Sequence, residues 1–131
     1  MPDNAYELFQ EARGLLEESK PRAAVSLLEQ AKRLEPGKGS ILETLGIAYY
    51  NSGYHQSAMR VFEEALEVDP TNHYARYALS RCLYRLGMLR RAIGQAKLAT
   101  VMAPEVEMYG EAVRRYQGEL AEKGERRDFE G

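Results

Sequence analysis

The chain has 131 residues, and 18 basic against 20 acidic side chains give it a formal net charge of −2. Apolar residues make up 44% of the sequence and charged residues 29%, a balance typical of folded globular proteins. The net charge excludes a general electrostatic attraction to nucleic acids or anionic membranes. A single cysteine excludes an internal disulfide framework. The sequence also lacks the stretch of about 20 apolar residues that a membrane-spanning helix needs.

The beginning of the chain has neither the basic region nor the apolar stretch of a secretory signal. We therefore expect a cytoplasmic protein. Its length is that of a single domain.

Three prolines lie at a constant interval of 34 residues: Pro36, Pro70 and Pro104. The interval divides the chain into units 5–38, 39–72 and 73–106 without a gap. Alanine recurs at two positions of every unit: Ala24, Ala58 and Ala92, then Ala31, Ala65 and Ala99. A fixed period of this length indicates stacked structural repeats.

Each unit has the apolar spacing of two amphipathic helices. The predicted helices are 4–18, 22–35, 39–52, 56–68, 73–86 and 90–103. Asn4 with Glu7 has the spacing of a capping box at the first helix. Gly53 and Gly87 stand at the inter-helix turn, where the first unit has Ser19.

One more helix is predicted over 105–122, because a stack of helix pairs needs a polar-backed helix to cover its last apolar face. The single domain is thus expected to span 1–122. Residues 123–131 lack apolar periodicity and are predicted to form a mobile charged tail.

The middle unit carries eight residues of a known pattern: Leu42, Leu45, Gly46, Tyr49, Ala58, Phe62, Ala65 and Pro70. The pattern resembles that of the tetratricopeptide repeat family. The first unit departs from it at Glu11, and the third at Arg76 and Ala96. The resemblance implies an all-α fold, a right-handed α-solenoid of three helix-turn-helix units with a capping helix.

The sequence contains no motif that combines the residues needed for catalysis. His55 and His73 are expected to be exposed and structural, and Cys82 to be a small buried apolar residue. Neither metal-ligand spacing nor a phosphate-binding glycine loop is present in the sequence. The prediction is a non-enzymatic protein without metal or cofactor.

The resemblance implies that the first helices of the units line a concave groove that takes an extended or helical partner segment. The predicted partner-binding residues at groove positions are Tyr6, Phe9, Arg13, Ile47, Tyr50, Asn51, Tyr74, Tyr77, Arg81, Tyr84 and Arg85, with Arg115 in the capping helix. Tyrosine and arginine are enriched at binding hot spots. Arg81 and Arg85 are four residues apart on one helical face and are expected to be solvent-accessible.

Charge is uneven along the chain. The middle unit has one basic and five acidic residues, whereas the third has six basic and one acidic. An acidic protein segment or a free C-terminal carboxylate is therefore the expected ligand.

One binding mode of the family can be tested from the sequence. The clamp that holds the C-terminal tails of heat-shock chaperones would fall on Phe9, Arg13, Thr44, Tyr74 and Ala78, which lack its Lys and Asn residues. Chaperone-tail binding is therefore not expected. Two alternatives remain open: self-association, with one copy filling the groove of another, and RNA binding by the third unit. The net negative charge and the lack of a recurring base-reading pair argue against RNA.

Overall fold

The computed structural model describes residues 4–130, with side-chain environments for residues 4–124. Its described part contains seven helices: α1 (Ala5–Glu17), α2 (Pro21–Leu34), α3 (Gly39–Asn51), α4 (His55–Val68), α5 (His73–Arg85), α6 (Leu89–Met102) and α7 (Glu107–Glu130). The predicted all-α architecture is confirmed. The first six helices begin and end within one residue of the predicted bounds.

The ends of the helices follow from local chemistry. The Asn4 side chain accepts a hydrogen bond of 2.9 Å from the backbone N–H of Glu7, as the capping prediction requires. Gly53 and Gly87 have φ angles of 85° and 80° in the turns between paired helices. Ser19, at the same place in the first unit, has a φ of 61°, a conformation that costs a residue with a Cβ about 1–2 kcal/mol.

Helix α7 differs from its predicted form. It starts at Glu107 and continues to Glu130, past the predicted end at 122. The segment predicted as a mobile charged tail, 123–131, is therefore helical as far as Glu130, and residue 131 lies outside the described residues. The prediction of a tail rested on the lack of apolar periodicity in this segment. Lys, Glu and Arg are nevertheless good helix formers, and one glycine costs a helix only about 1 kcal/mol.

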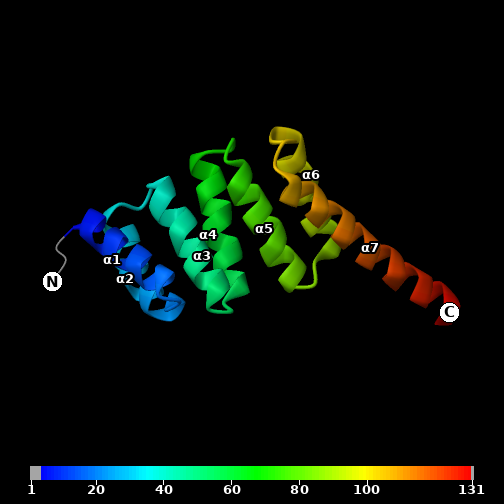
Figure 1. Ribbon diagram of the computed structural model, residues 1–131, viewed down its shortest axis with the longest axis horizontal. Helices are drawn as coiled ribbons and strands as arrows, with labels where there is room; N and C mark the ends of the chain where they lie inside the picture. The colour runs from blue at the N-terminus through cyan, green and yellow to red at the C-terminus, as the bar shows by residue number, and fades with distance from the viewer. Residues whose placement is uncertain (1–3, 131) are drawn as a thin grey trace.

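The helices form a row in which each packs against the next (Figure 1). Among the first helices, α1 also contacts α3 and α3 contacts α5, and they come closer together than successive second helices do. The row therefore curves with α1, α3 and α5 on its inner side. The far end of α7 extends beyond the other helices (Figure 1).

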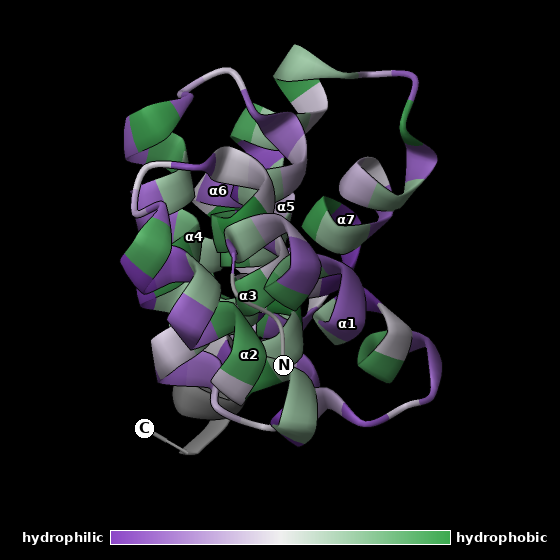
Figure 2. Cartoon of the chain, turned by 90° about the vertical axis from the view of Figure 1, so that its left-hand side faces the viewer, coloured by the Kyte–Doolittle hydropathy of each residue, from purple (hydrophilic) through white to green (hydrophobic). Residues whose placement is uncertain are grey.

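The core lies between the paired helices. Figure 2 shows apolar segments gathered where the helices face one another. The recurring alanines are all 0–1% exposed, so helix backbones approach closely along the whole stack. Gly46 allows the closest approach, because a Cβ there would lie 2.6 Å from the ring of Phe62.

Candidate functional site

The predicted groove residues of α3 and α5 meet around Tyr50. The guanidinium carbon of Arg81 lies 4.4 Å from the centre of the Tyr50 ring and 6.0 Å from that of Tyr77. Arg85 donates a hydrogen bond of 3.1 Å from Nε to the Tyr50 hydroxyl. One tyrosine of α3 thus orients two arginines of α5, through a cation–π contact and a hydrogen bond.

The arrangement repeats one unit later, between α5 and α7. Arg115 lies over the Tyr84 ring at 5.0 Å and donates a hydrogen bond of 3.2 Å to its hydroxyl. The Tyr84 hydroxyl in turn donates to Glu119 at 2.7 Å. Tyr84 also stacks on Tyr116, with ring centres 4.5 Å apart. Arg115 and Tyr84 each lie 34 residues after their counterparts, Arg81 and Tyr50.

Tyr74 adjoins the first group, with its ring centre 6.4 Å from that of Tyr77. We call the two groups on α3, α5 and α7 the tyrosine–arginine surface: Tyr50, Tyr74, Tyr77, Arg81, Tyr84, Arg85 and Arg115. Sequence reasoning selected every one of them. It did not assign Tyr116 and Glu119 to this surface, although extending the 34-residue interval into α7 would have placed Glu119 level with Arg85.

A small hollow opens on this surface. It has a volume of about 30 Å³ and is lined by Ile47, Tyr50, Asn51, Phe62, Tyr74, Ala78 and Arg81. A small-molecule site usually needs about 300 Å³ or more. The hollow is therefore too small for a drug-sized molecule.

Burial and charge give the surface its character. Arg85 is exposed, whereas Arg81 is half-buried beneath the tyrosines. Both arginines were expected to be solvent-accessible; Arg81 is only partly exposed, because the Tyr50 ring covers one face of its guanidinium. Among the described side chains, neither Arg81, Arg85 nor Arg115 forms a salt bridge.

Two pKa shifts follow from the same packing. Burial raises the pKa of the Tyr74 hydroxyl above its ordinary value, with the nearby Glu43 adding to the effect. The hydrogen bond to Tyr50 raises the pKa of Arg85. Both shifts favour the protonated forms, the neutral phenol of Tyr74 and the positive guanidinium of Arg85.

The predicted site residues of α1 form a separate group. Arg13 lies 5.8 Å from the Phe9 ring on the same helix. Phe9 packs against the core, and Tyr6 is 67% exposed. No described contact joins these three residues to the tyrosine–arginine surface.

The histidine predictions need correction. His55 and His73 were expected to be exposed, but both are half-buried. The Nδ1 atom of His73 lies 2.8 Å from the hydroxyl of the buried Tyr109 in α7. His55 packs edge-on against Tyr50, and burial followed by the charge of Arg85 lowers its pKa. The His73 contact reaches α7 across 36 residues, and the His55 contact forms across the turn between α3 and α4.

Cys82 is buried as predicted, at 0% exposed. Burial raises the pKa of its thiol to about 12, so the thiolate is scarce at neutral pH. Within residues 4–124 the side chains form no group of three His, Cys, Asp or Glu residues suited to a metal ion. No helix in the described part of the chain has the length and apolarity needed to cross a membrane.

The sequence model of the tetratricopeptide repeat matches residues 52–109. The matched segment therefore carries tetratricopeptide repeat sequence, and the helices on either side of it extend the same succession of helix pairs. A human protein, the O-mannosyl-transferase TMTC1, is 34% identical over 55 residues, which are 42% of this chain and 6% of that protein.

Two solved structures share the fold. The first tetratricopeptide repeat domain of Spaghetti (RPAP3), bound to the HSP90 peptide SRMEEVD, has a TM-score of 0.86 and 14% identity, covering 90% of this chain and 94% of that one. The Yersinia enterocolitica type III secretion chaperone SycD, in complex with a peptide of the translocator YopD, has a TM-score of 0.80 and 16% identity, covering 88% and 93%.

Proposed function

We propose that the chain is a protein-interaction module whose tyrosine–arginine surface binds an acidic segment of a partner protein. The observation that carries the proposal is the pair of arginines held against Tyr50. Arg81 makes a cation–π contact at 4.4 Å, and Arg85 uses one donor at 3.1 Å. Neither forms a salt bridge among the described side chains, so most of their N–H donors remain available to a carboxylate.

The chemistry around the arginines suits a peptide. Tyrosine offers a large rigid contact area at low entropic cost and a hydroxyl that can satisfy peptide backbone groups. The hollow between Tyr50, Tyr74 and Arg81 is too small for a drug-sized molecule. A segment that becomes ordered on binding must offset its own lost entropy, so we expect affinity on the order of micromolar.

The solved relatives support the same role in general terms. Two proteins with this fold were solved with bound peptides, one from HSP90 and one from YopD. Their identities of 14% and 16% carry the fold alone. The chaperone clamp positions hold Phe9, Arg13, Thr44, Tyr74 and Ala78 in this chain. We therefore propose a ligand other than a chaperone tail.

The test uses short labelled peptides rich in Asp and Glu, each made with a free and with an amidated C-terminus. Fluorescence anisotropy measures their binding to the parent chain and to two variants. Arg85→Glu should weaken binding about tenfold or more, because it reverses an exposed charge at the centre of the surface. Arg60→Glu, an equal charge change at an exposed position of α4, is the control and should bind as the parent does.

A third variant tests the role of the planar guanidinium. Arg81→Lys keeps the positive charge near Tyr50 but loses the two-pronged donor geometry for carboxylates, so it should also bind more weakly. If Arg85→Glu and Arg60→Glu bind the peptides equally well, the tyrosine–arginine surface is not the binding site. A preference for free over amidated C-termini would identify the terminal carboxylate as the recognised group.

A further inference from the structure

A second hollow lies at the C-terminal end of the stack, away from the tyrosine–arginine surface. It has a volume of about 360 Å³ between the first turn of α6 and the extended part of α7. We call it the α6–α7 hollow. Its lining residues are Gly87, Met88, Leu89, Arg90, Arg91, Leu120, Lys123 and Gly124. None of them belongs to the predicted groove positions.

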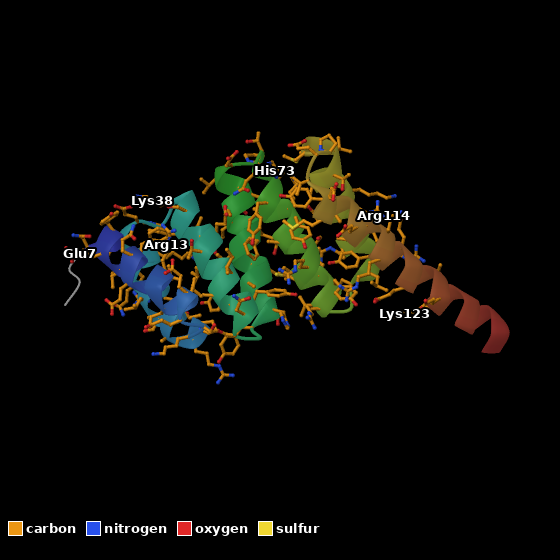
Figure 3. All side chains as sticks on the ribbon, viewed as in Figure 1. Glu7, Arg13, Lys38, His73, Arg114 and Lys123 are labelled. Carbon is orange, nitrogen blue, oxygen red and sulfur yellow. The ribbon has the colours of Figure 1, made fainter. Side chains whose placement is uncertain are left out.

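The wall contributed by α7 exists because this helix does not stop where the other first helices stop. Helices α1, α3 and α5 end at Glu17, Asn51 and Arg85, at equivalent places of their units. Continued by the same interval, α7 would end at 119, but it runs to Glu130. The additional length brings Leu120, Lys123 and Gly124 to the hollow. Figure 3 shows Lys123 on this outer part of α7, beyond Arg114.

Three cationic side chains line the hollow without a partner of opposite charge. Arg90, Arg91 and Lys123 are exposed and form no salt bridge among the described side chains. Glu119, one helical turn before Lys123 in α7, accepts a hydrogen bond from the hydroxyl of Tyr84 instead. The only described hydrogen bond of these cations is a contact of 3.6 Å between Arg91 and the Met88 sulfur.

The corresponding place in the first unit is electrostatically different. The hollow there is lined by Ser19, Lys20, Pro21, Arg22, Ala23, Asn51 and Ser52. Each of its two cations has an interaction partner. The Lys20 ammonium lies 3.9 Å from the Glu18 carboxylate, and the Arg22 guanidinium lies 5.9 Å from the centre of the Tyr54 ring. The middle unit has no cation at its equivalent positions 54–57. Among the three turns inside the helix pairs, within the described side chains, the α6–α7 hollow is the one whose cations lack a charged or aromatic partner.

Apolar surface lies beside these charges. Leu89 is 7% exposed and Leu120 is half-buried, while Met88 is 41% exposed. A simple anion would use the cations and leave this surface in water. A peptide that combines carboxylates with one large apolar side chain would use both, since burying such a side chain is favourable.

We infer that the α6–α7 hollow is a second binding site, for an acidic peptide segment with a large apolar side chain, held between Arg90, Arg91 and Lys123. The site does not depend on the tyrosine–arginine surface. The partner segment places its apolar side chain against Leu89 and Leu120 and its carboxylates on the surrounding cations. Because these charges are exposed, binding weakens as salt concentration rises.

The experiment titrates the full chain with the peptide Ac-DEFDE-NH2 and follows backbone amide signals by NMR. The signals of Leu89, Arg90 and Leu120 should shift, and those of Tyr50 and Tyr74 should shift less. The variant Arg90→Glu/Arg91→Glu should bind about tenfold or more weakly. Its melting temperature should not fall, because acidic side chains in the first turn of a helix are favourable.

The control variant is Lys97→Glu/Arg114→Glu, which makes the same change in net charge at exposed positions outside the hollow. It should retain binding. Equal binding by the two double variants would overturn the site. Shifts centred on Tyr50 and Tyr74 would do so as well, since they would assign the peptide to the tyrosine–arginine surface.

Two further measurements test the nature of the ligand. Ac-DEGDE-NH2 has the same charge but no large side chain, and it should bind several-fold more weakly than Ac-DEFDE-NH2. Equal shifts with this peptide or with inorganic phosphate would overturn the apolar contribution and leave a simple anion site. If sedimentation shows self-association that Arg90→Glu/Arg91→Glu abolishes, the occupant is a second copy of the chain and the proposed partner is wrong.

Discussion

The closest packing in the core gives a sharp test of the fold. A Cβ added at Gly46 would lie 2.6, 2.7 and 2.8 Å from three carbon atoms of the Phe62 ring. These distances are about 0.6–0.8 Å short of ordinary contact at 3.4 Å. Phe62 is 1% exposed, and the hollow that it lines has a volume of only about 30 Å³. Gly46→Ala should therefore push α3 and α4 apart.

The magnitude results from two opposing effects. Overpacking a dense core costs about 1–3 kcal/mol, while replacing a helical glycine by alanine gains about 1 kcal/mol. Because all three contacts are shorter than 3.0 Å, we take the upper part of the overpacking range, about 2–3 kcal/mol, and expect a net loss of about 1–2 kcal/mol in the free energy of unfolding. For a domain of this size the loss corresponds to a fall of roughly 3–10 °C in melting temperature. Thermal and urea denaturation followed by circular dichroism measure both quantities.

Two variants isolate the cause. Gly94→Ala lies in the interior of α6, where an added Cβ meets nothing within 4 Å, so this control should stabilise the chain by about 0.5–1 kcal/mol. In a Phe62→Leu background, Gly46→Ala should lose its cost, which makes the pair non-additive in a double-mutant cycle. A Gly46→Ala variant as stable as the Gly94→Ala variant, or additive with Phe62→Leu, would refute the proposed clash.

Three other predictions follow from single residues. Ser19→Gly should raise the free energy of unfolding by about 1 kcal/mol, because it relieves a positive φ of 61°; an unchanged urea midpoint would contradict this. Ala58→Leu should destabilise the fold by about 1–3 kcal/mol in the same assay, since Ala58 is 0% exposed between helices; a melting temperature equal to the parent's would show that space exists there. His55 has a lowered pKa in the folded chain, so its neutral form is favoured, and the stability it contributes is lost as pH falls below about 6.5. The melting temperature of His55→Gln should fall less between pH 8 and pH 5 than that of the parent, and identical pH profiles would count against this role.

The sequence by itself determined the repeats and the helices. A constant interval of 34 residues, with alanines at fixed places, required one helix pair to recur. Glycines and prolines then marked where each helix ends, because they act on the backbone within a residue or two. The same interval reveals complementary sizes at two facing positions: Ala12 with Leu28, Gly46 with Phe62, and Ser80 with Ala96. The structure then shows how close the middle pair is, because a Cβ at Gly46 would lie 2.6 Å from the Phe62 ring.

The choice of residues for the tyrosine–arginine surface also came from the sequence, through the resemblance of the repeats to a known family. Position within a repeat indicates which side of a helix a residue occupies. It does not indicate which partner a long side chain chooses. An arginine at the position of Arg81 can extend into water, but Arg81 lies over the ring of Tyr50 in the preceding unit. Arg115 makes the equivalent contact with Tyr84.

Tertiary structure alone decided the burial of Arg81 and His73 and the existence of the α6–α7 hollow. Each depends on the distance and angle between helices far apart in the sequence. His73 contacts Tyr109, 36 residues later in the sequence. Lys123 lines the same hollow as Arg90 only because α7 continues past the stack. Local propensity sets where a helix begins, whereas packing between helices sets which side chains share a surface and which charges remain unpaired.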